Sequence, residues 1–123
     1  MGRRNSNESL FEQIATHSGF CVLQPRSIRI NDPVVDKCGI KRKIVTTPDW
    51  YVVDPASRQG VHVEVTDSSG CTPHKDAQRR VVEKARISNY VVVTGDQIQQ
   101  LLASSLEERR QLLSLYLFSL NAG

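Results

Sequence analysis

Residues 47–75, TPDWYVVDPASRQGVHVEVTDSSGCTPHK, form the stretch that decides the fold. Two runs rich in valine and aromatic residues, 49–54 and 61–66, flank the turn-rich segment DPASRQG, which predicts an antiparallel hairpin. Side chains alternate along a strand, so the three valines of the second run are expected to face a core. The side chains between them would share the opposite face: His62, Glu64 and Thr66.

An antiparallel partner strand can bring a second carboxylate to that opposite face, by placing Asp49 beside Glu64. Two carboxylates at close range repel, so one stays protonated unless a cation lies between them. Hard oxygen ligands favour Mg²⁺ or Mn²⁺, and Mg²⁺ typically takes one or two protein carboxylates and leaves sites for water and a substrate phosphate. The alternative is that both acids are ordinary surface charges at strand ends.

The length and composition are those of one globular domain covering residues 1–123. The chain is 39% apolar and 24% charged, enough to bury a core of its own. Its first residues, MGRRNSNESLFEQ, are too polar for a secretory signal, and no apolar run approaches membrane-spanning length. We therefore expect a soluble intracellular protein, cytoplasmic or, in a eukaryote, nuclear, with no membrane partner. The three cysteines are widely spaced and predict reduced thiols.

The net charge of +3 is unevenly distributed along the chain. Residues 46–74 carry one basic and four acidic groups, whereas residues 1–45 carry eight and four and residues 75–86 carry five and two. An acidic centre between basic segments suits a polyanion such as nucleic acid. The basic triplet 41–43 also fits an edge strand whose charges prevent aggregation. The candidate phosphate contacts are Lys41, Arg42, Lys43, Arg79 and Arg80.

The remaining pattern predicts helices around the hairpin. A helix is expected over residues 8–18, with a capping box from Ser9 to Glu12 and an end near Gly19. Residues 1–7 would form a mobile basic tail. Short strands are expected at 20–23, 27–30 and 38–45, with a turn at 31–33, then a helix over 74–88, a strand over 89–94 and a short helix capped by Thr94. The last helix, within 104–121, is apolar on more than one face, so it either covers the sheet or forms a homodimer seam.

This order of elements resembles the core of the PD-(D/E)XK nuclease superfamily over roughly residues 8–103. The resemblance is carried by Pro48-Asp49 and Glu64-Val65-Thr66, followed by a basic helix and an apolar strand. It implies an α/β (α+β) class with a restriction-endonuclease-like αβββαβ core, a mixed central sheet flanked by helices, and here an extra C-terminal helix. It also implies that Asp49 and Glu64 are the catalytic, metal-binding carboxylates.

The chain departs from the family pattern at position 66, where Thr66 stands in place of the motif lysine. Some family members supply this cation from the following helix, which makes Lys75 the candidate. Gln78 resembles a helix glutamine of some branches, and His74 is similar to a helix histidine of the mismatch-repair branch. Three further accessory candidates each have a structural alternative. Glu12 would be a helix-dipole partner, His62 a surface histidine and Thr66 a plain β-former.

Together these features predict Mg²⁺- or Mn²⁺-dependent hydrolysis of phosphodiester bonds in nucleic acid, with DNA favoured over RNA. An RNA endonuclease is one alternative. A second is a nuclease-like module that binds nucleic acid without turnover, which the missing lysine at position 66 allows. A third is a protein-interaction domain that uses the C-terminal helix.

Overall fold

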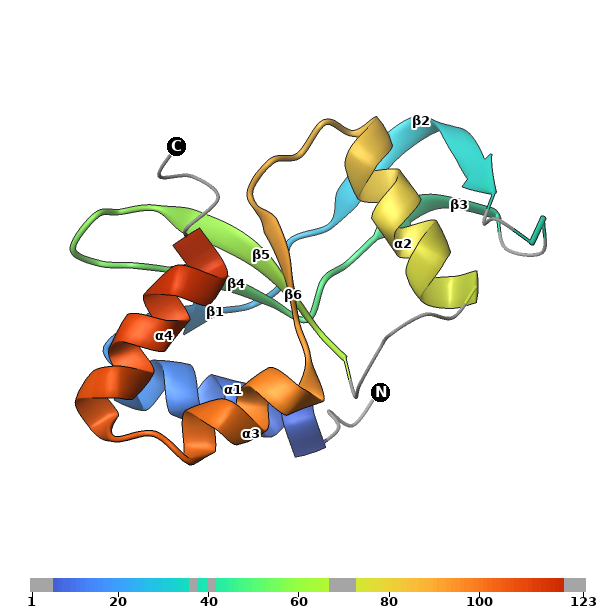
Figure 1. Cartoon of the computed structure of the whole chain (residues 1–123). Coiled ribbons are helices and arrows are strands. Elements are labelled where there is room, and N and C mark those ends of the chain that lie inside the picture. The colour runs from blue at the N-terminus through green and yellow to red at the C-terminus, as the bar shows by residue number, and fades with distance from the viewer. Residues whose placement is uncertain (1–5, 36–37, 40–41, 67–72, 119–123) are drawn as a thin grey trace.

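The computed structural model describes residues 6–35, 38–39, 42–66 and 73–118, with residues 73–75 described for their backbone alone. Four helices and six strands follow one another along the chain (Figure 1). Their order is α1 (Ser6–His17), β1 (Cys21–Leu23), β2 (Ile28–Val35), β3 (Arg42–Thr46), β4 (Trp50–Val53), β5 (Gly60–Val65), α2 (Pro73–Lys84), β6 (Tyr90–Val93), α3 (Gly95–Leu102) and α4 (Leu106–Phe118).

The central sheet is mixed and has the strand order β1-β4-β5-β6. β1 pairs with β4 and β4 with β5 in antiparallel fashion, whereas β6 returns through α2 to lie parallel to β5. The predicted hairpin, the αβββαβ order, the mixed sheet and the extra C-terminal helix are therefore confirmed. β2 and β3 form a separate two-stranded sheet inserted between β1 and β4.

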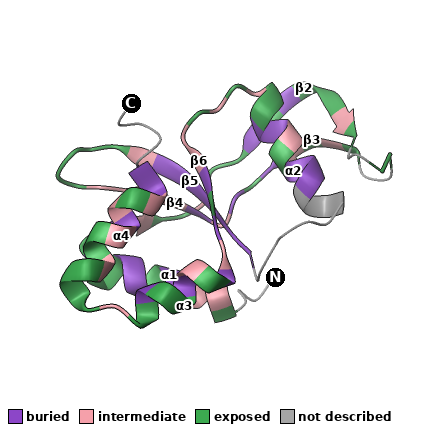
Figure 2. Cartoon of the chain, viewed as in Figure 1, coloured by how far each residue is buried: buried purple, intermediate pink, exposed green. Residues whose placement is uncertain are grey.

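Two hydrophobic clusters hold these layers together. The larger one joins α1, α3 and α4 to one face of the central sheet, which we call the valine face because Val61, Val63 and Val65 lie on it with almost no exposed surface. The smaller one packs α2 against β2 and β3 through Ile28, Ile30, Val81 and Val82. In Figure 1 the sheet accordingly runs between a group of three helices and the unit formed by α2, β2 and β3. Figure 2 shows β5 buried over most of its length.

Side-chain caps set several helix boundaries as the sequence predicts. Thr94 accepts a hydrogen bond from the Gln97 backbone N–H, and the Gln97 side chain accepts one from the Thr94 N–H. Ser105 and Glu108 form the same reciprocal pair at the start of α4. Such a cap satisfies N–H groups that have no partner within the helix. At the end of α1, Gly19 has φ +96°, a backbone conformation that glycine adopts without strain.

Two boundary predictions are wrong. α1 begins at Ser6, so Ser9 lies inside the helix and cannot cap it, and residues 6–7 belong to α1 instead of the predicted tail. Residues 31–33 lie within β2, where a shift of register between Arg29 and Val34 accommodates the turn-like sequence. α4 packs on the sheet through the side of Leu113 and Leu117, whereas Leu115, on the opposite side of this helix, is about three-fifths exposed.

Candidate functional site

The face of the sheet opposite the valine face carries polar side chains, and we call it the polar face. In the β4–β5 ladder Trp50 lies opposite Val63 and Tyr51 opposite His62. Continuing the register by one residue places Asp49 opposite Glu64, and residues directly opposite each other in an antiparallel pair point to the same face. The two predicted carboxylates, which we call the acid pair, therefore share the polar face.

A backbone hydrogen bond fixes the first member of the acid pair. Asp49 lies in a bend between the buried Pro48 and the first residue of β4, and its Oδ2 accepts a hydrogen bond of 2.7 Å from the backbone N–H of Val65. This bond draws the half-buried carboxylate against the end of β5, next to Glu64. It also leaves the second oxygen, Oδ1, as an acceptor for another group.

The second member of the acid pair is deeply buried. Glu64 has only 3% of its surface exposed and lies between β4 and β6, in register with Val92. Burying a carboxylate is costly unless a hydrogen bond or an opposite charge compensates it. The two acids together concentrate negative charge at one place on a buried face.

The pKa of Tyr90 reflects this concentration of charge. It begins β6 in register with His62 on the polar face. Burial raises the pKa of its phenol far above the ordinary value, Glu64 and Asp49 raise it further, and Arg79 opposes them. Both acids therefore act on one hydroxyl group. Tyr90 was not identified as a site residue from the sequence. Its position beside His62 follows from the parallel pairing of β5 with β6, which the sequence alone does not give.

Two further buried oxygens, one following β5 and one on α2, have no hydrogen-bond partner among the described residues. Thr66 Oγ1 and Gln78 Oε1 are buried and accept no hydrogen bond from the part of the chain that the structure describes. Thr66 follows β5, and its backbone N–H donates to the Val93 carbonyl, whereas Gln78 lies on the buried side of α2. Because a buried acceptor without a partner is unfavourable, a water or a hydrated cation is a suitable companion for both oxygens.

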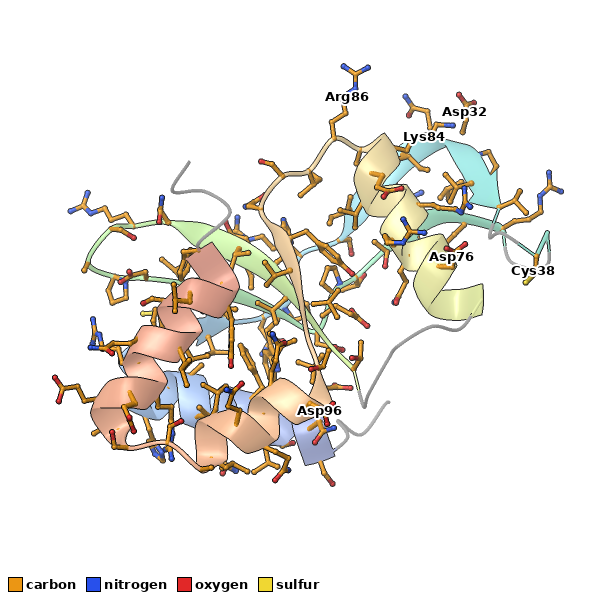
Figure 3. The ribbon with its side chains drawn as sticks, in the orientation of Figure 1. Asp32, Cys38, Asp76, Lys84, Arg86 and Asp96 are labelled. Atoms are coloured by element: carbon orange, nitrogen blue, oxygen red, sulfur yellow. The ribbon has the colours of Figure 1, made fainter. Side chains whose placement is uncertain are left out.

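Of the predicted basic residues, the two arginines of α2 are paired with acids on the same helix. Asp76 Oδ1 accepts a 2.7 Å hydrogen bond from Arg79 and Oδ2 a 2.9 Å hydrogen bond from Arg80, and Arg79 also pairs with Glu83. These two arginines are thus held by neighbours on α2 (Figure 3 labels Asp76). On β3, Arg42 is exposed and Lys43 half-buried. Lys41 lies outside the described residues, as do the side chains of His74 and Lys75.

Glu12 is not brought to the acid pair by any described contact. It is exposed on α1, and its neighbours Phe11, Ile14 and Ala15 pack on the valine face. Its two predicted roles, as a helix-dipole partner and as an accessory acid of the site, both stay predictions.

His62 lies one step along β5 from Glu64, in an aromatic group. Its ring meets the Tyr51 ring edge-on at 5.0 Å between centroids, and the Arg26 guanidinium lies over the Tyr51 ring at 4.2 Å. Burial lowers the pKa of His62 and the Arg26 charge lowers it further, which favours the neutral imidazole. Sequence reasoning identified His62 but missed Arg26, which reaches this face from the segment between β1 and β2.

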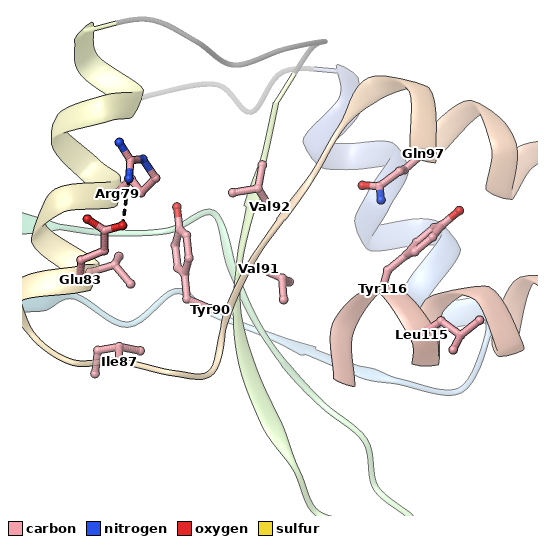
Figure 4. Close-up of a pocket in the computed structure, with 10 residues that line it drawn as sticks. Arg79, Glu83, Ile87, Tyr90, Val91, Val92, Gln97, Leu115 and Tyr116 are labelled. Atoms are coloured by element: carbon pink, nitrogen blue, oxygen red, sulfur yellow. Dashed lines mark hydrogen bonds and ion pairs between the residues drawn. The ribbon is translucent and has the colours of Figure 1, made fainter. Parts of the chain in front are cut away.

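A pocket of about 570 Å³ opens beside this region, between α2, β6 and α4 (Figure 4). Tyr90 and Arg79 line its α2 side, and Gln97, Leu115 and Tyr116 line the other. β6 is the edge strand of the central sheet, and its Val92 is 45% exposed at this place. Because Tyr90 lines this pocket, solvent can reach part of its side chain there.

The donor set of the polar face fits a hard divalent cation. Among the described residues no group of three or more His, Cys, Asp or Glu side chains is gathered for a metal. The acid pair offers two carboxylates, the number that Mg²⁺ typically takes when water and a substrate phosphate complete its coordination. Cys21 and Cys38 are exposed cysteines that form no disulfide.

In the described part of the chain, none of the helices combines the length and the apolarity needed to cross a membrane. Comparisons of the chain with protein-family models, with curated proteins and with solved structures find no match.

Proposed function

We propose that the protein is a Mg²⁺- or Mn²⁺-dependent nuclease that hydrolyses phosphodiester bonds of nucleic acid, with DNA favoured as substrate. One observation carries the proposal: the register of β4 and β5 places Asp49 opposite Glu64 on a buried polar face, with Asp49 Oδ2 bonded to the Val65 N–H. Two carboxylates on the same face of the sheet are a donor set that a hard divalent cation can share.

The topology supports the same proposal. The resemblance to the PD-(D/E)XK superfamily implies an αβββαβ order, with one acid before a central strand and the other on the next strand. The chain has this order in α1, β1, β4, β5, α2 and β6. The inserted β2–β3 hairpin leaves the order of the central sheet unchanged.

In this mechanism Asp49 and Glu64 hold and orient the reacting centre. A cation bound there would polarise the scissile phosphate and lower the pKa of an attacking water. The Val65 N–H keeps the Asp49 carboxylate in place, and Thr66 Oγ1 and Gln78 Oε1 offer acceptors for ordered water. Lys75, on the first turn of α2, is proposed to stabilise the charge that develops on the phosphate, because Thr66 occupies the position of the motif lysine.

Cleavage assays test the proposal directly. Labelled single-stranded, duplex and branched DNA, and RNA, are incubated with the protein in Mg²⁺ or Mn²⁺ and in chelator. We expect metal-dependent cleavage by the wild type, and its loss in Asp49→Ala and Glu64→Ala. Cleavage that persists in both variants would refute the assignment of the site. Lys75→Ala should lower cleavage while leaving metal affinity unchanged.

A second candidate function is binding of nucleic acid without turnover. The observation that favours it is Thr66, a neutral side chain where the family motif has lysine. This candidate predicts salt-dependent DNA binding that involves Arg42 and Lys43, without cleavage in any metal. Arg79 and Arg80 would contribute less, because each already pairs with Asp76.

A homodimer through α4 also belongs to the proposal. Leu106 and Leu115 are both about three-fifths exposed, but they lie on opposite sides of the helix, so Leu115, on the side away from Leu113, is the residue proposed for the seam. Sedimentation of the wild type and of Leu115→Glu would show whether the chain self-associates there.

A further inference from the structure

One arginine near the acid pair differs from the two arginines of α2. Arg26 is exposed, and no carboxylate of the described chain lies within ion-pair distance of it. Arg79 and Arg80, in contrast, are each bonded to Asp76. Arg26 is thus a positive charge that the fold positions without neutralising it.

The position of Arg26 is set by stacking. Its guanidinium lies 4.2 Å from the centre of the Tyr51 ring. Stacking on an aromatic face orients the planar guanidinium and leaves its N–H groups pointing outward in the plane, where they can meet a phosphate. The Tyr51 ring is itself held, since His62 meets it edge-on and the ring lies so close over Gly60 that a side chain at position 60 would collide with it.

The stack lies on the polar face, next to the acid pair. In the β4–β5 register, the step after the opposed Asp49 and Glu64 on this face is Tyr51 opposite His62. Two residues along a strand span roughly 7 Å. A nucleic acid strand presents a phosphate about every 3.4 Å of helix axis in a duplex, so a strand bound at the acids brings a neighbouring phosphate near Arg26.

We propose that Arg26, held in place by Tyr51, forms a second subsite that binds a backbone phosphate beside the one at the acid pair. This inference rests on the proposed function, because the acid pair defines where the strand lies. A phosphate contact carries no information about base identity. The subsite therefore strengthens binding of DNA of any sequence and fixes the direction in which the strand crosses the sheet.

Fluorescence anisotropy with fluorescein-labelled single-stranded DNA and its duplex tests the subsite. Binding is measured over a range of salt concentrations in the Glu64→Gln background, so that cleavage does not interfere. Arg26→Gln should weaken binding about tenfold, equally for a thymine-only and a mixed sequence. The slope of log K against log salt should fall in magnitude by about 0.7 for the single strand and 0.9 for the duplex.

Two variants serve as comparisons. Arg86→Gln removes the same charge from an exposed residue beyond the end of α2 (Figure 3) and should leave affinity and slope close to those of the parent. Tyr51→Leu retains Arg26 but removes its support, so it should lower affinity with a smaller change in slope. Circular dichroism checks that each variant is folded.

The outcomes separate the subsite from the proposed function. If the wild type cleaves DNA but Arg26→Gln matches Arg86→Gln in affinity and slope, the subsite is refuted and the nuclease stands. If the wild type cleaves nothing but Arg26→Gln still lowers affinity and slope, the nuclease is refuted and the phosphate subsite stands. Failure of the wild type to bind DNA at low salt would refute the subsite as well.

Discussion

The two faces of β5 are both buried but chemically opposite. Val61, Val63 and Val65 are enclosed by α1, α3 and α4, whereas His62 and Glu64 alternate with them and are at least nine-tenths buried on the other side. Burial of the valines favours folding, by about 1.5–3 kcal/mol for each fully buried side chain. Burial of a carboxylate opposes folding unless it is compensated. One face of the strand thus builds the fold, and the other holds ionisable groups whose burial requires compensation.

The largest expected effect lies on the polar face. Glu64→Gln and Asp49→Asn should each lower cleavage by about 10²- to 10³-fold, because each removes a ligand charge at the reacting centre. Urea unfolding without metal should show a smaller loss of stability than a cavity-forming core variant, because the amide keeps the shape of the carboxylate that it replaces. Glu107→Gln and Asp32→Asn, at exposed sites, are the matched controls. Loss of stability equal to that of a core variant would make Glu64 a structural residue.

On the valine face the effects are reversed. Val63→Ala should lower the free energy of unfolding by about 2 to 3 kcal/mol, because it leaves a cavity in the larger cluster. Cleavage per folded molecule should be unchanged. Val92→Ala is the control for the same substitution at a partly exposed site, where a change within about 0.5 kcal/mol is expected. A large loss of activity in folded Val63→Ala would mean that the two faces are coupled.

Gly60→Ala tests the packing of the polar face without touching a charge. A side chain at position 60 would meet the Tyr51 ring, so we expect a loss of about 1 to 2 kcal/mol in unfolding free energy. Tyr51→Ala in the same chain should relieve the collision. Urea unfolding of both single variants and the double variant measures this coupling. Additive effects would show that Tyr51 does not pack over Gly60 in solution.

The smallest effect is expected at the cap of α3, which carries Ile98 and Leu101 to the valine face. Thr94→Ala removes the side-chain acceptor for the Gln97 N–H and should cost about 1 kcal/mol. Thermal unfolding measures this loss, and Ser105→Ala at the start of α4 provides a similar cap for comparison. Metal-dependent cleavage should not change in either variant.

The sequence predicted those features that follow from local periodicity. The alternation in residues 61–66 correctly assigned the two faces of β5, and the spacing of Thr94 and Gln97 indicated the cap of α3. These patterns involve residues a few positions apart, so the local backbone determines them. The same reasoning failed at residues 31–33, because pairing of β2 with β3 overrides a turn-like sequence.

The rest of the candidate site depends on long-range neighbours. Tyr90 joins the polar face only because β6 pairs with β5, and Arg26 only because its loop reaches Tyr51. The pairing of Arg79 and Arg80 with Asp76 depends on side-chain rotamers as well as on helical spacing. Charge counts along the chain therefore identified the basic helix but not which of its arginines remain available to a phosphate.

Titration calorimetry with Mn²⁺ tests most directly whether Asp49 and Glu64 share one cation. We predict that the wild type binds Mn²⁺, that Asp49→Asn and Glu64→Gln each abolish or greatly weaken this binding, and that Asp32→Asn leaves it intact. Wild-type affinity for Mn²⁺ retained in both Asp49→Asn and Glu64→Gln would contradict a shared metal site on the polar face.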